Sequence, residues 1–171
     1  MIQTTIPEFR LRPATDTDIP IILSFIQELA DYEQLAHEVV ATEEILRRNL
    51  FGERQVAEVI LGYWNDEPVS FALFFHNFST FLGKPGLYLE DLYVKSEMRG
   101  RGIGTTLLSY LAKLAVERNC GRFEWSVLDW NEPAIRVYRA IGAEGLDEWT
   151  VQRVTGEALT QLARNFDTPK K

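Results

Sequence analysis

The sequence predicts an α/β (α+β) fold in which a mixed sheet carries helices on both faces. Segments 55–63, 68–77 and 87–94 follow one another with strand patterns, and strands joined by short turns lie antiparallel. After them, strand and helix patterns alternate, and this alternation requires crossover helices over the sheet. With 171 residues, 46% of them apolar, the chain can bury one core, so a single domain is expected over 1–171, ordered at about 9–166.

The N-terminal part of the chain combines one short strand with two helices. Phe9–Arg12 is expected to form the strand, and apolar residues then recur at the helical period. The first helix is expected to begin with Asp16 or Thr17 as its cap and to fade near Tyr32–Gln34. The second helix begins at Thr42, whose hydroxyl can accept a hydrogen bond from a main-chain amide of the first turn.

The middle of the chain predicts a hairpin and then a loop. Asn65-Asp66-Glu67 is a turn sequence that joins the first two strands of the run. Residues 79–86 are rich in Gly and Pro, so a loop is expected there, ahead of the strand at 87–94.

The last part of the chain predicts two helix–strand alternations. Thr105–Arg118 has Leu and Ala on one face and is expected to be a helix, followed by a strand at Arg122–Leu128. Asn131 is expected to cap the next helix, which has a proline in its first turn. Trp149–Val154 and Glu157–Phe166 then complete the chain as strand and helix.

The bulk properties narrow the function classes. A net charge of −7 disfavours a nucleic-acid partner, because phosphate binding needs clustered Lys and Arg. The chain starts with no signal-peptide pattern, and no apolar run is long enough to span a bilayer, so no membrane partner is expected. The single Cys120 cannot form a disulfide framework, which favours the cytoplasm. His37 and His76 match no metal-ligand spacing, so no metal is expected.

The segment Arg99–Gly104 carries three glycines between an expected strand and an amphipathic helix. Such a turn lets main-chain amides approach a ligand closely, and the positive end of the helix favours an anion there. The two arginines at the helix start are unfavourable unless an anion compensates them. The turn therefore predicts a phosphate site, against the simpler alternative of a strand-to-helix turn with solvated arginines.

The glycine spacing excludes the two common nucleotide motifs. Gly100, Gly102 and Gly104 do not match the G-x-G-x-x-G pattern of dinucleotide-binding domains. The segment also lacks the lysine of a P-loop. The ligand is therefore a phosphate compound of another class.

Glu90 and Asp91 interrupt an otherwise apolar strand. Adjacent side chains of a regular strand face opposite sides, so one of these carboxylates would point into the core. Because an unpaired buried carboxylate costs several kcal/mol, either it meets a cleft or a bulge redirects it. The simpler alternative is a carboxylate that forms a salt bridge at the edge of the sheet and has a structural role only.

The glycine-rich segment resembles the Q/R-x-x-G-x-G/A signature of the GNAT acetyltransferase superfamily, with Arg99, Gly102 and Gly104 at the defining positions. The order of the expected elements also resembles the GNAT fold, whose central strands splay apart in a V. Further strings are similar to the spermidine/spermine (diamine) acetyltransferase branch and cover about Phe9–Ala163. They are Arg12-Pro13-Ala14-Thr15, Glu28-Leu29-Ala30, Tyr32-Glu33, Leu87-Tyr88-Leu89-Glu90-Asp91, Trp130-Asn131-Glu132-Pro133, and Tyr138 with Gly142-Ala143.

The resemblance implies acetyl-CoA as co-substrate and assigns residues to it. The main chain of Leu92, Tyr93 and Val94 would bond the pantetheine arm and polarise the thioester carbonyl. Tyr138 would contact the cofactor and protonate the leaving thiolate, and Asn131 would reach the pantetheine. The pyrophosphate would be held by the turn, that is by Arg99, Gly100, Arg101, Gly102, Ile103, Gly104 and Thr105. Tyr138 and Asn131 each also have a simpler role. A helix tyrosine commonly anchors the core, and Asn131 can act as a helix cap alone.

The acceptor is expected to be the primary amine of a small cationic molecule. Glu90 would bind the ammonium group and accept its proton through water. The other acceptor-site residues implied by the resemblance are Tyr32, Glu33, Asp91, Glu148 and Trp149, although Glu33 and Glu148 fit solvated surface equally well. The diamine enzymes carry an acidic residue where this chain has Ser79 or Thr80, so a shorter amine such as a diamine, thialysine or another lysine-like amino acid fits as well as a polyamine.

Direct transfer of acetyl from acetyl-CoA to such an amine is the function that these residues favour, and the branch implies a homodimer. Two other functions remain open. One is acetylation of a protein N-terminus or lysine, which an open peptide groove would favour. The other is a non-catalytic acyl-CoA-binding sensor.

Overall fold

The computed structural model describes residues 1–167, which form two compact units. The first is Met1–Asp129 and the second begins at Trp130. The first unit contains the whole sheet and the glycine-rich turn, and the second contains Asn131 and Tyr138. The single domain expected from the sequence stays a prediction.

The first unit is built on a six-stranded sheet in the order β1-β2-β3-β4-β5-β6. Strands β1 to β5 pair antiparallel with their neighbours, and β6 is parallel to β5. This confirms the mixed, mostly antiparallel sheet. The strands are β1 (Ile2–Gln3), β2 (Phe9–Pro13), β3 (Glu58–Trp64), β4 (Glu67–Ser79), β5 (Lys84–Val94) and β6 (Phe123–Trp125).

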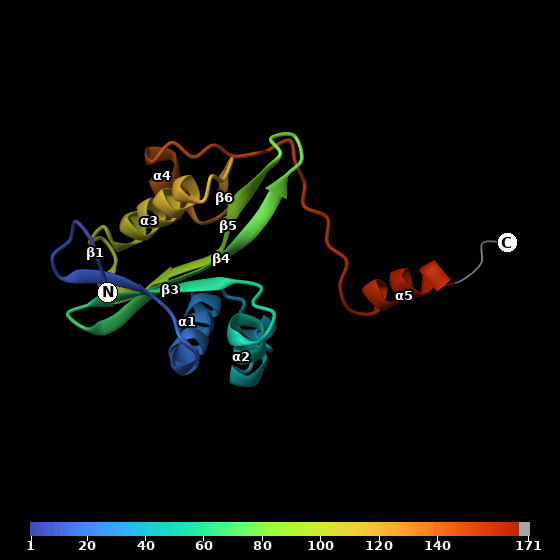
Figure 1. The fold of residues 1–171 in the computed structure, drawn as a ribbon, viewed down its shortest axis with the longest axis horizontal. Coiled ribbons are helices and arrows are strands. Elements are labelled where there is room, and N and C mark those ends of the chain that lie inside the picture. The colour runs from blue at the N-terminus through green and yellow to red at the C-terminus, as the bar shows by residue number, and fades with distance from the viewer. Residues whose placement is uncertain (168–171) are drawn as a thin grey trace. The chain divides into compact units, whose positions relative to one another are not determined.

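Helices cover both faces of this sheet. In the first unit α1 and α2 lie on one face and α3 lies on the other (Figure 1). The α-helices are α1 (Ile19–Tyr32), α2 (Glu43–Phe51), α3 (Ile103–Glu117), α4 (Glu132–Ala140) and α5 (Gly156–Asp167). Short 3₁₀ turns are η1 (Asp16–Asp18), η2 (Ala36–Glu38) and η3 (Ser96–Met98).

The core between α1 and the sheet follows from two periodicities. Phe25 comes from the apolar stripe of α1, and Phe71 and Tyr93 come from alternating positions of β4 and β5. The rings of Phe25 and Phe71 stack with centroids 5.6 Å apart, and Tyr93 packs against Phe25 at 6.1 Å. This packing fixes the end of α1 close to the end of β5, where the predicted site residues lie.

Two local predictions are confirmed in detail. The hairpin between β3 and β4 has Asn65 and Asp66 at positive φ, 46° and 71°, as a two-residue turn with the twist of the strands requires. Thr42 caps α2, because its Oγ1 accepts a hydrogen bond from the Ile45 amide at 3.3 Å.

The expected cap of α1 at Asp16 or Thr17 is wrong. Thr15 occupies the cap position of the preceding turn, and its amide donates to Asp18 Oδ2 at 2.7 Å. The Asp18 carboxylate also accepts two hydrogen bonds from the Arg12 guanidinium, at 2.7 and 2.8 Å. The ion pair from β2 therefore selects Asp18, a long-range contact that the local pattern does not contain.

Half of the expected loop at 79–86 is strand. Strands β4 and β5 continue to Ser79 and Lys84, which pair with each other, so only residues 80–83 form the turn. Pro85 is compatible with the ladder because it lies near the end of the hairpin, opposite Phe78. Helix α3 also begins earlier than expected, at Ile103 rather than Thr105.

Two further strand predictions differ from the structure. Residues 149–154 form no strand in the described chain, because no strand offers them a hydrogen-bonded ladder. Strand β6 is limited to Phe123–Trp125 instead of 122–128, since its pairing with β5 ends at Leu89. Apolar alternation alone specifies neither the presence nor the length of a neighbouring strand.

Candidate active site

Strand β5 contains a bulge at Glu90. Leu89 pairs with Phe74 of β4 and Asp91 pairs with Leu73, so Glu90 is an extra residue with no partner opposite it. This confirms the bulge that the sequence offered as one of two explanations for the adjacent carboxylates. Glu90 is exposed and Asp91 is half-buried, so the bulge spares the core a fully buried carboxylate.

The bulge coincides with the place where the central strands separate. The parallel ladder between β5 and β6 pairs Leu87 with Phe123 and ends at Leu89 with Trp125. Beyond that pair, β5 keeps β4 as its only strand neighbour within the described chain. One edge of residues 92–94, the segment expected to bond pantetheine, is therefore left without a strand partner.

Three carboxylates gather around the bulge. Burial, and then the charges of Glu90 and Glu33, raise the pKa of Asp91 from 3.8 to about 6. Burial also raises the pKa of Glu33, which follows the last residue of α1. In residues 1–167 no Lys or Arg forms an ion pair with any of the three. The cluster is thus a negative site that a cation would stabilise.

The glycine-rich turn has the backbone that an anion site requires. Gly100 and Gly102 adopt φ of 76° and 80°, a region that favours glycine, and Gly102 is the residue before α3. The first helical hydrogen bond runs from the Thr106 amide to the Gly102 carbonyl at 2.9 Å. The amides of Ile103, Gly104 and Thr105 therefore have no carbonyl to bond within the helix. They point toward the N-terminal end, where the helix dipole favours phosphate.

Gly104 lies close to the end of β5. It is in the first turn of α3, where an added Cβ would be 3.9 Å from the side chains of both Leu92 and Val94, an ordinary contact distance. The first turn of α3 therefore lies next to the end of β5. The segment expected to hold pyrophosphate is thereby set beside the strand expected to hold pantetheine.

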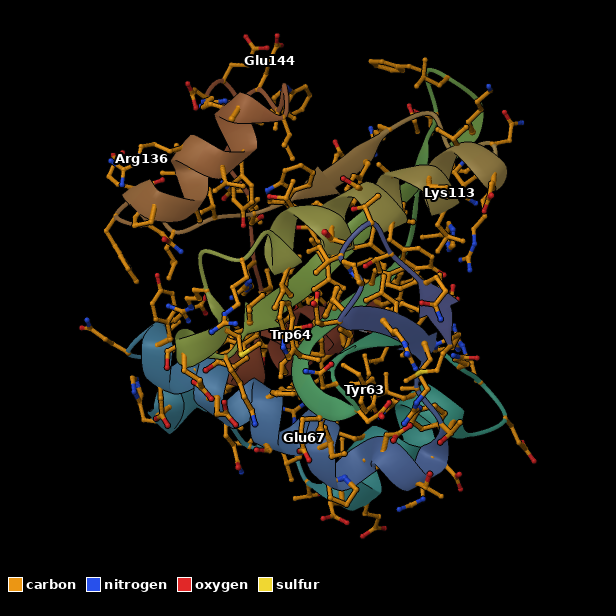
Figure 2. The ribbon with its side chains drawn as sticks, turned by 90° about the vertical axis from the view of Figure 1, so that its left-hand side faces the viewer. Tyr63, Trp64, Glu67, Lys113, Arg136 and Glu144 are labelled. Carbon is orange, nitrogen blue, oxygen red and sulfur yellow. The ribbon has the colours of Figure 1, made fainter. Side chains whose placement is uncertain are left out.

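The two arginines of the turn lie on aromatic rings. The Arg101 guanidinium is 5.2 Å from the ring centroid of Trp64, which lies near the β3–β4 hairpin (Figure 2). The Arg99 guanidinium is 4.2 Å from the ring centroid of Tyr32, and its Nε donates to the Val94 carbonyl at 3.1 Å. These contacts join Tyr32, an expected acceptor residue, to the end of β5. Contact of either arginine with phosphate stays a prediction.

Glu28 faces the end of β5, although the sequence assigned it no role in the site. Its carboxylate, near the Tyr93 hydroxyl, raises the pKa of Tyr93 in addition to the larger effect of burial. Glu28 lies one helical turn before Tyr32, on the same side of α1. The spacing of Glu28 and Tyr32 can be read from the sequence, whereas the proximity of Tyr93 to Glu28 depends on the fold.

Ser79 serves the hairpin. It is buried, and its Oγ accepts a hydrogen bond from the Leu82 amide at 3.3 Å. Ser79 is one of the two positions, with Thr80, at which an acidic residue of the diamine enzymes was expected to be replaced, and its hydroxyl is engaged in the turn.

The remaining predicted site residues belong to the second unit. Asn131 caps α4, since its Oδ1 accepts a hydrogen bond from the Ala134 amide at 3.4 Å, as the sequence predicts. Tyr138 lies in the second half of this helix. Glu148 and Trp149 lie in the non-helical segment between α4 and α5. Their roles toward cofactor and substrate stay predictions.

Comparison with known proteins identifies the family. Residues 23–143 match the model described as the acetyltransferase (GNAT) family. The chain belongs to the GNAT family. It is accordingly an acetyl-CoA-dependent N-acetyltransferase, and the resemblance drawn from the turn motif and the element order is confirmed.

Relatives match this GNAT enzyme over most of their length. A thialysine N-epsilon-acetyltransferase of Mus musculus is 38% identical over 165 residues, which cover 90% of this chain and 96% of the relative. An L-ornithine N5-acetyltransferase of Arabidopsis thaliana is 34% identical, with 90% and 87% of the two chains covered. A solved integron cassette protein of V. cholerae superposes with a TM-score of 0.77 at 28% identity, covering 92% and 98%.

No helix within 1–167 is long and apolar enough to cross a membrane. In the same part of the chain, no group of three or more His, Cys, Asp and Glu side chains could hold a metal ion.

Proposed function

We propose that this GNAT enzyme acetylates the terminal primary amine of a short cationic molecule, a diamine or a lysine-like amino acid such as thialysine or ornithine. The observation that carries the proposal is the cluster of Glu33, Glu90 and Asp91 at the bulge, which has no basic partner in the described chain. A bound ammonium group would relieve the repulsion among these carboxylates. Relatives named for thialysine and for ornithine acetylation support the same acceptor class.

The reaction also requires a group that accepts the proton of the amine, and a carboxylate can serve as that group. An amine with a pKa of about 10.4 is only about 0.04% neutral at pH 7, so its proton must be removed before or during attack. Glu90 is exposed at the bulge and can take that proton through a water molecule. Asp91 and Glu33, which are half-buried, are better suited to holding the positive charge of the substrate.

The reaction is direct transfer. The neutral amine nitrogen attacks the thioester carbon, the carbon–sulfur bond breaks, and the thiolate of CoA leaves. In our proposal the main chain of Leu92–Val94 stabilises the oxyanion, and Tyr138 donates its phenolic proton to the thiolate. The nitrogen gives up its second proton to water, and the phenol of Tyr138 is reprotonated from solvent. The amides at the start of α3 hold the pyrophosphate. Asn131 contacts the pantetheine, Glu148 and Trp149 contribute to the acceptor site, and the enzyme acts as a homodimer.

The role of Ser79 favours short acceptors. A long polyamine presents a second ammonium group, and a serine hydroxyl bound to the Leu82 amide provides no charge for it. A diamine or an α-amino acid with one distal amine does not depend on that anchor. Spermidine is therefore expected to be the weaker substrate.

The test is CoA release measured with acetyl-CoA and a panel of amines. The panel contains thialysine, ornithine, lysine, putrescine, spermidine, an aminoglycoside and a peptide with a free N-terminus. We expect kcat/KM for the best short amine to exceed that for the peptide by about 100-fold, a transition-state difference of roughly 2.7 kcal/mol. A preference for the peptide would instead support a protein acetyltransferase. Acetyl-CoA binding without CoA release from any amine would support a sensor.

A further inference from the structure

The side chain of Arg99 contacts the end of β5 and the end of α1. Its Nε donates to the Val94 carbonyl at 3.1 Å, and its guanidinium lies over the ring of Tyr32 at 4.2 Å. The ring of Tyr93 is the next aromatic group, at 5.7 Å. One face of the guanidinium therefore contacts Tyr32 at the end of α1, and its Nε–H bonds the Val94 carbonyl at the end of β5.

The residue that Arg99 contacts is part of the acceptor side. Tyr32 is the last residue of α1, and Glu33, one of the three clustered carboxylates, follows it directly. The helix ends here: the Glu33 amide donates to the Leu29 carbonyl, and the next residue, Gln34, has a positive φ of 62°. Main-chain hydrogen bonds from Gln34 to Asp31 and from Leu35 to Ala30 close this helix end, so a side-chain contact here acts on the direction of the side chains of Tyr32 and Glu33 and not on the backbone.

Two contacts connect α1 with the end of β5. Tyr93 packs on Phe25, and two helical turns later Arg99, which donates to the Val94 carbonyl, lies on Tyr32. Arg99 itself begins the glycine-rich turn, whose next residues have the backbone geometry for the donor phosphates. The side chain of Arg99 therefore connects the segment expected to hold acetyl-CoA with the segment expected to hold the amine.

We propose that Arg99 is a positioning residue for the amine acceptor, acting through Tyr32, and is not a ligand of the CoA phosphates. The proposal rests on the proposed function of this site. Loss of the guanidinium removes its contact with the Tyr32 ring and changes the direction of the Tyr32 and Glu33 side chains relative to the other two carboxylates. The amine then binds more weakly, whereas the amides at the start of α3 still bind acetyl-CoA.

The chemistry of arginine suits this role. A planar guanidinium can lie flat on a ring and donate in its own plane to a carbonyl at the same time. Lysine keeps the charge above the ring but cannot make both contacts in one geometry. Lysine at this position is therefore expected to preserve part of the effect, and glutamine is expected to preserve little of it.

The experiment compares Arg99→Gln, Arg99→Lys, Tyr32→Leu and the double variant Arg99→Gln/Tyr32→Leu in the full-length chain. Arg101→Gln is the matched control, since it removes the same charge two residues later from a different ring, that of Trp64. Two quantities are measured: the acetyl-CoA Kd by calorimetry without amine, and kcat and KM for the best short amine at saturating acetyl-CoA. Circular dichroism and Tm show that each variant is folded.

We expect Arg99→Gln to raise the amine KM about tenfold while the acetyl-CoA Kd stays within about twofold, consistent with loss of a cation–π contact and its hydrogen bond. Arg99→Lys is expected to lie between wild type and Arg99→Gln. Arg101→Gln is expected to change the Kd more than the amine KM. The double variant is expected to be no worse than the poorer single variant, because both substitutions break one contact.

Several results would overturn the proposal. A tenfold weaker acetyl-CoA Kd for Arg99→Gln with an unchanged amine KM would make Arg99 a phosphate ligand. Full additivity with Tyr32→Leu would show that Arg99 does not act through that ring. If Arg99→Gln does not fold, Arg99→Lys decides between the same two patterns. A wild-type chain that releases no CoA with any amine overturns the proposed function as well, so the two failures are distinguishable.

Discussion

Asp91 lies opposite Leu73 while Leu89 lies opposite Phe74, and Glu90 between them has no partner of its own. This one-residue bulge leaves Glu90 exposed and Asp91 half-buried, although the two carboxylates are adjacent in sequence. The difference assigns them different physical properties. Glu90 can exchange a proton with water, and Asp91 is a carboxylate that the fold disfavours in its charged form.

Asp91→Asn is expected to stabilise the protein at neutral pH. The folded-state pKa of Asp91, about 6, lies above its usual 3.8, so ionisation costs stability as pH rises through this range. The gain from the substitution should be absent below pH 3.8 and should reach at most about 3 kcal/mol above pH 6. Urea unfolding of both proteins at pH 4 and pH 8 measures it. An equal difference at the two pH values would mean that the charge of Asp91 is not the cause.

Asp18→Asn is expected to act in the opposite direction. The hydrogen bonds from Arg12 lower the pKa of Asp18 from 3.8 to about 2, so its stabilisation is present above pH 3.8 and is lost as pH falls through 2. The variant should lose about 2 kcal/mol at pH 7. Asp16→Asn is the control, because the Asp16 carboxylate forms an exposed ion pair with Arg47, at 3.5 Å. A similar loss in both variants would exclude the buried ion pair as the cause.

Gly100→Ala tests the anion site at the start of α3 against backbone strain. Gly100 and Gly83 both have positive φ, 76° and 62°, and an added Cβ meets nothing within 4 Å at either position. Alanine should therefore cost about 1 kcal/mol of stability at both positions. Only Gly100→Ala should weaken acetyl-CoA binding, by about tenfold, because only Gly100 lies in the turn that is expected to hold the pyrophosphate. Equal acetyl-CoA Kd values for the two variants would contradict the placement of the pyrophosphate at this turn.

Tyr138→Phe is expected to lower kcat by about tenfold or more with little change in either KM, because it removes a proton donor and keeps the ring. Tyr110→Phe in α3 provides a comparison for the loss of a hydroxyl elsewhere. Steady-state CoA release with the best short amine gives both values. Turnover of Tyr138→Phe within about twofold of wild type would exclude Tyr138 as the general acid.

Local signals predicted much of the fold. The Asn65-Asp66 pair specified the hairpin because few residues tolerate positive φ, and Thr42 and Asn131 specified helix starts through their side-chain oxygens. The adjacent carboxylates at Glu90 likewise required a departure from regular strand geometry. Each of these predictions depends on interactions between residues that lie within four positions of one another in the sequence.

Features that depend on distant partners were not predictable in the same way. The expected strand at 149–154 requires a neighbour that a local pattern cannot specify, and the choice of Asp18 over Asp16 depends on Arg12 of another strand. For the same reason, the contact between Arg99 and the ring of Tyr32, which are 67 positions apart, could not be predicted from the turn motif. Side-chain direction at the site follows from packing between α1 and β5.

The central claim is that the carboxylate at the bulge takes part in acetyl transfer to a small amine. The most direct measurement compares wild type and Glu90→Gln in kcat/KM for the best short amine, with the acetyl-CoA Kd measured in parallel. We predict a loss of about 100-fold in kcat/KM, as expected for removal of a proton acceptor, with the Kd within about twofold. A kcat/KM within about twofold of wild type, or no CoA release from any amine, would contradict the account.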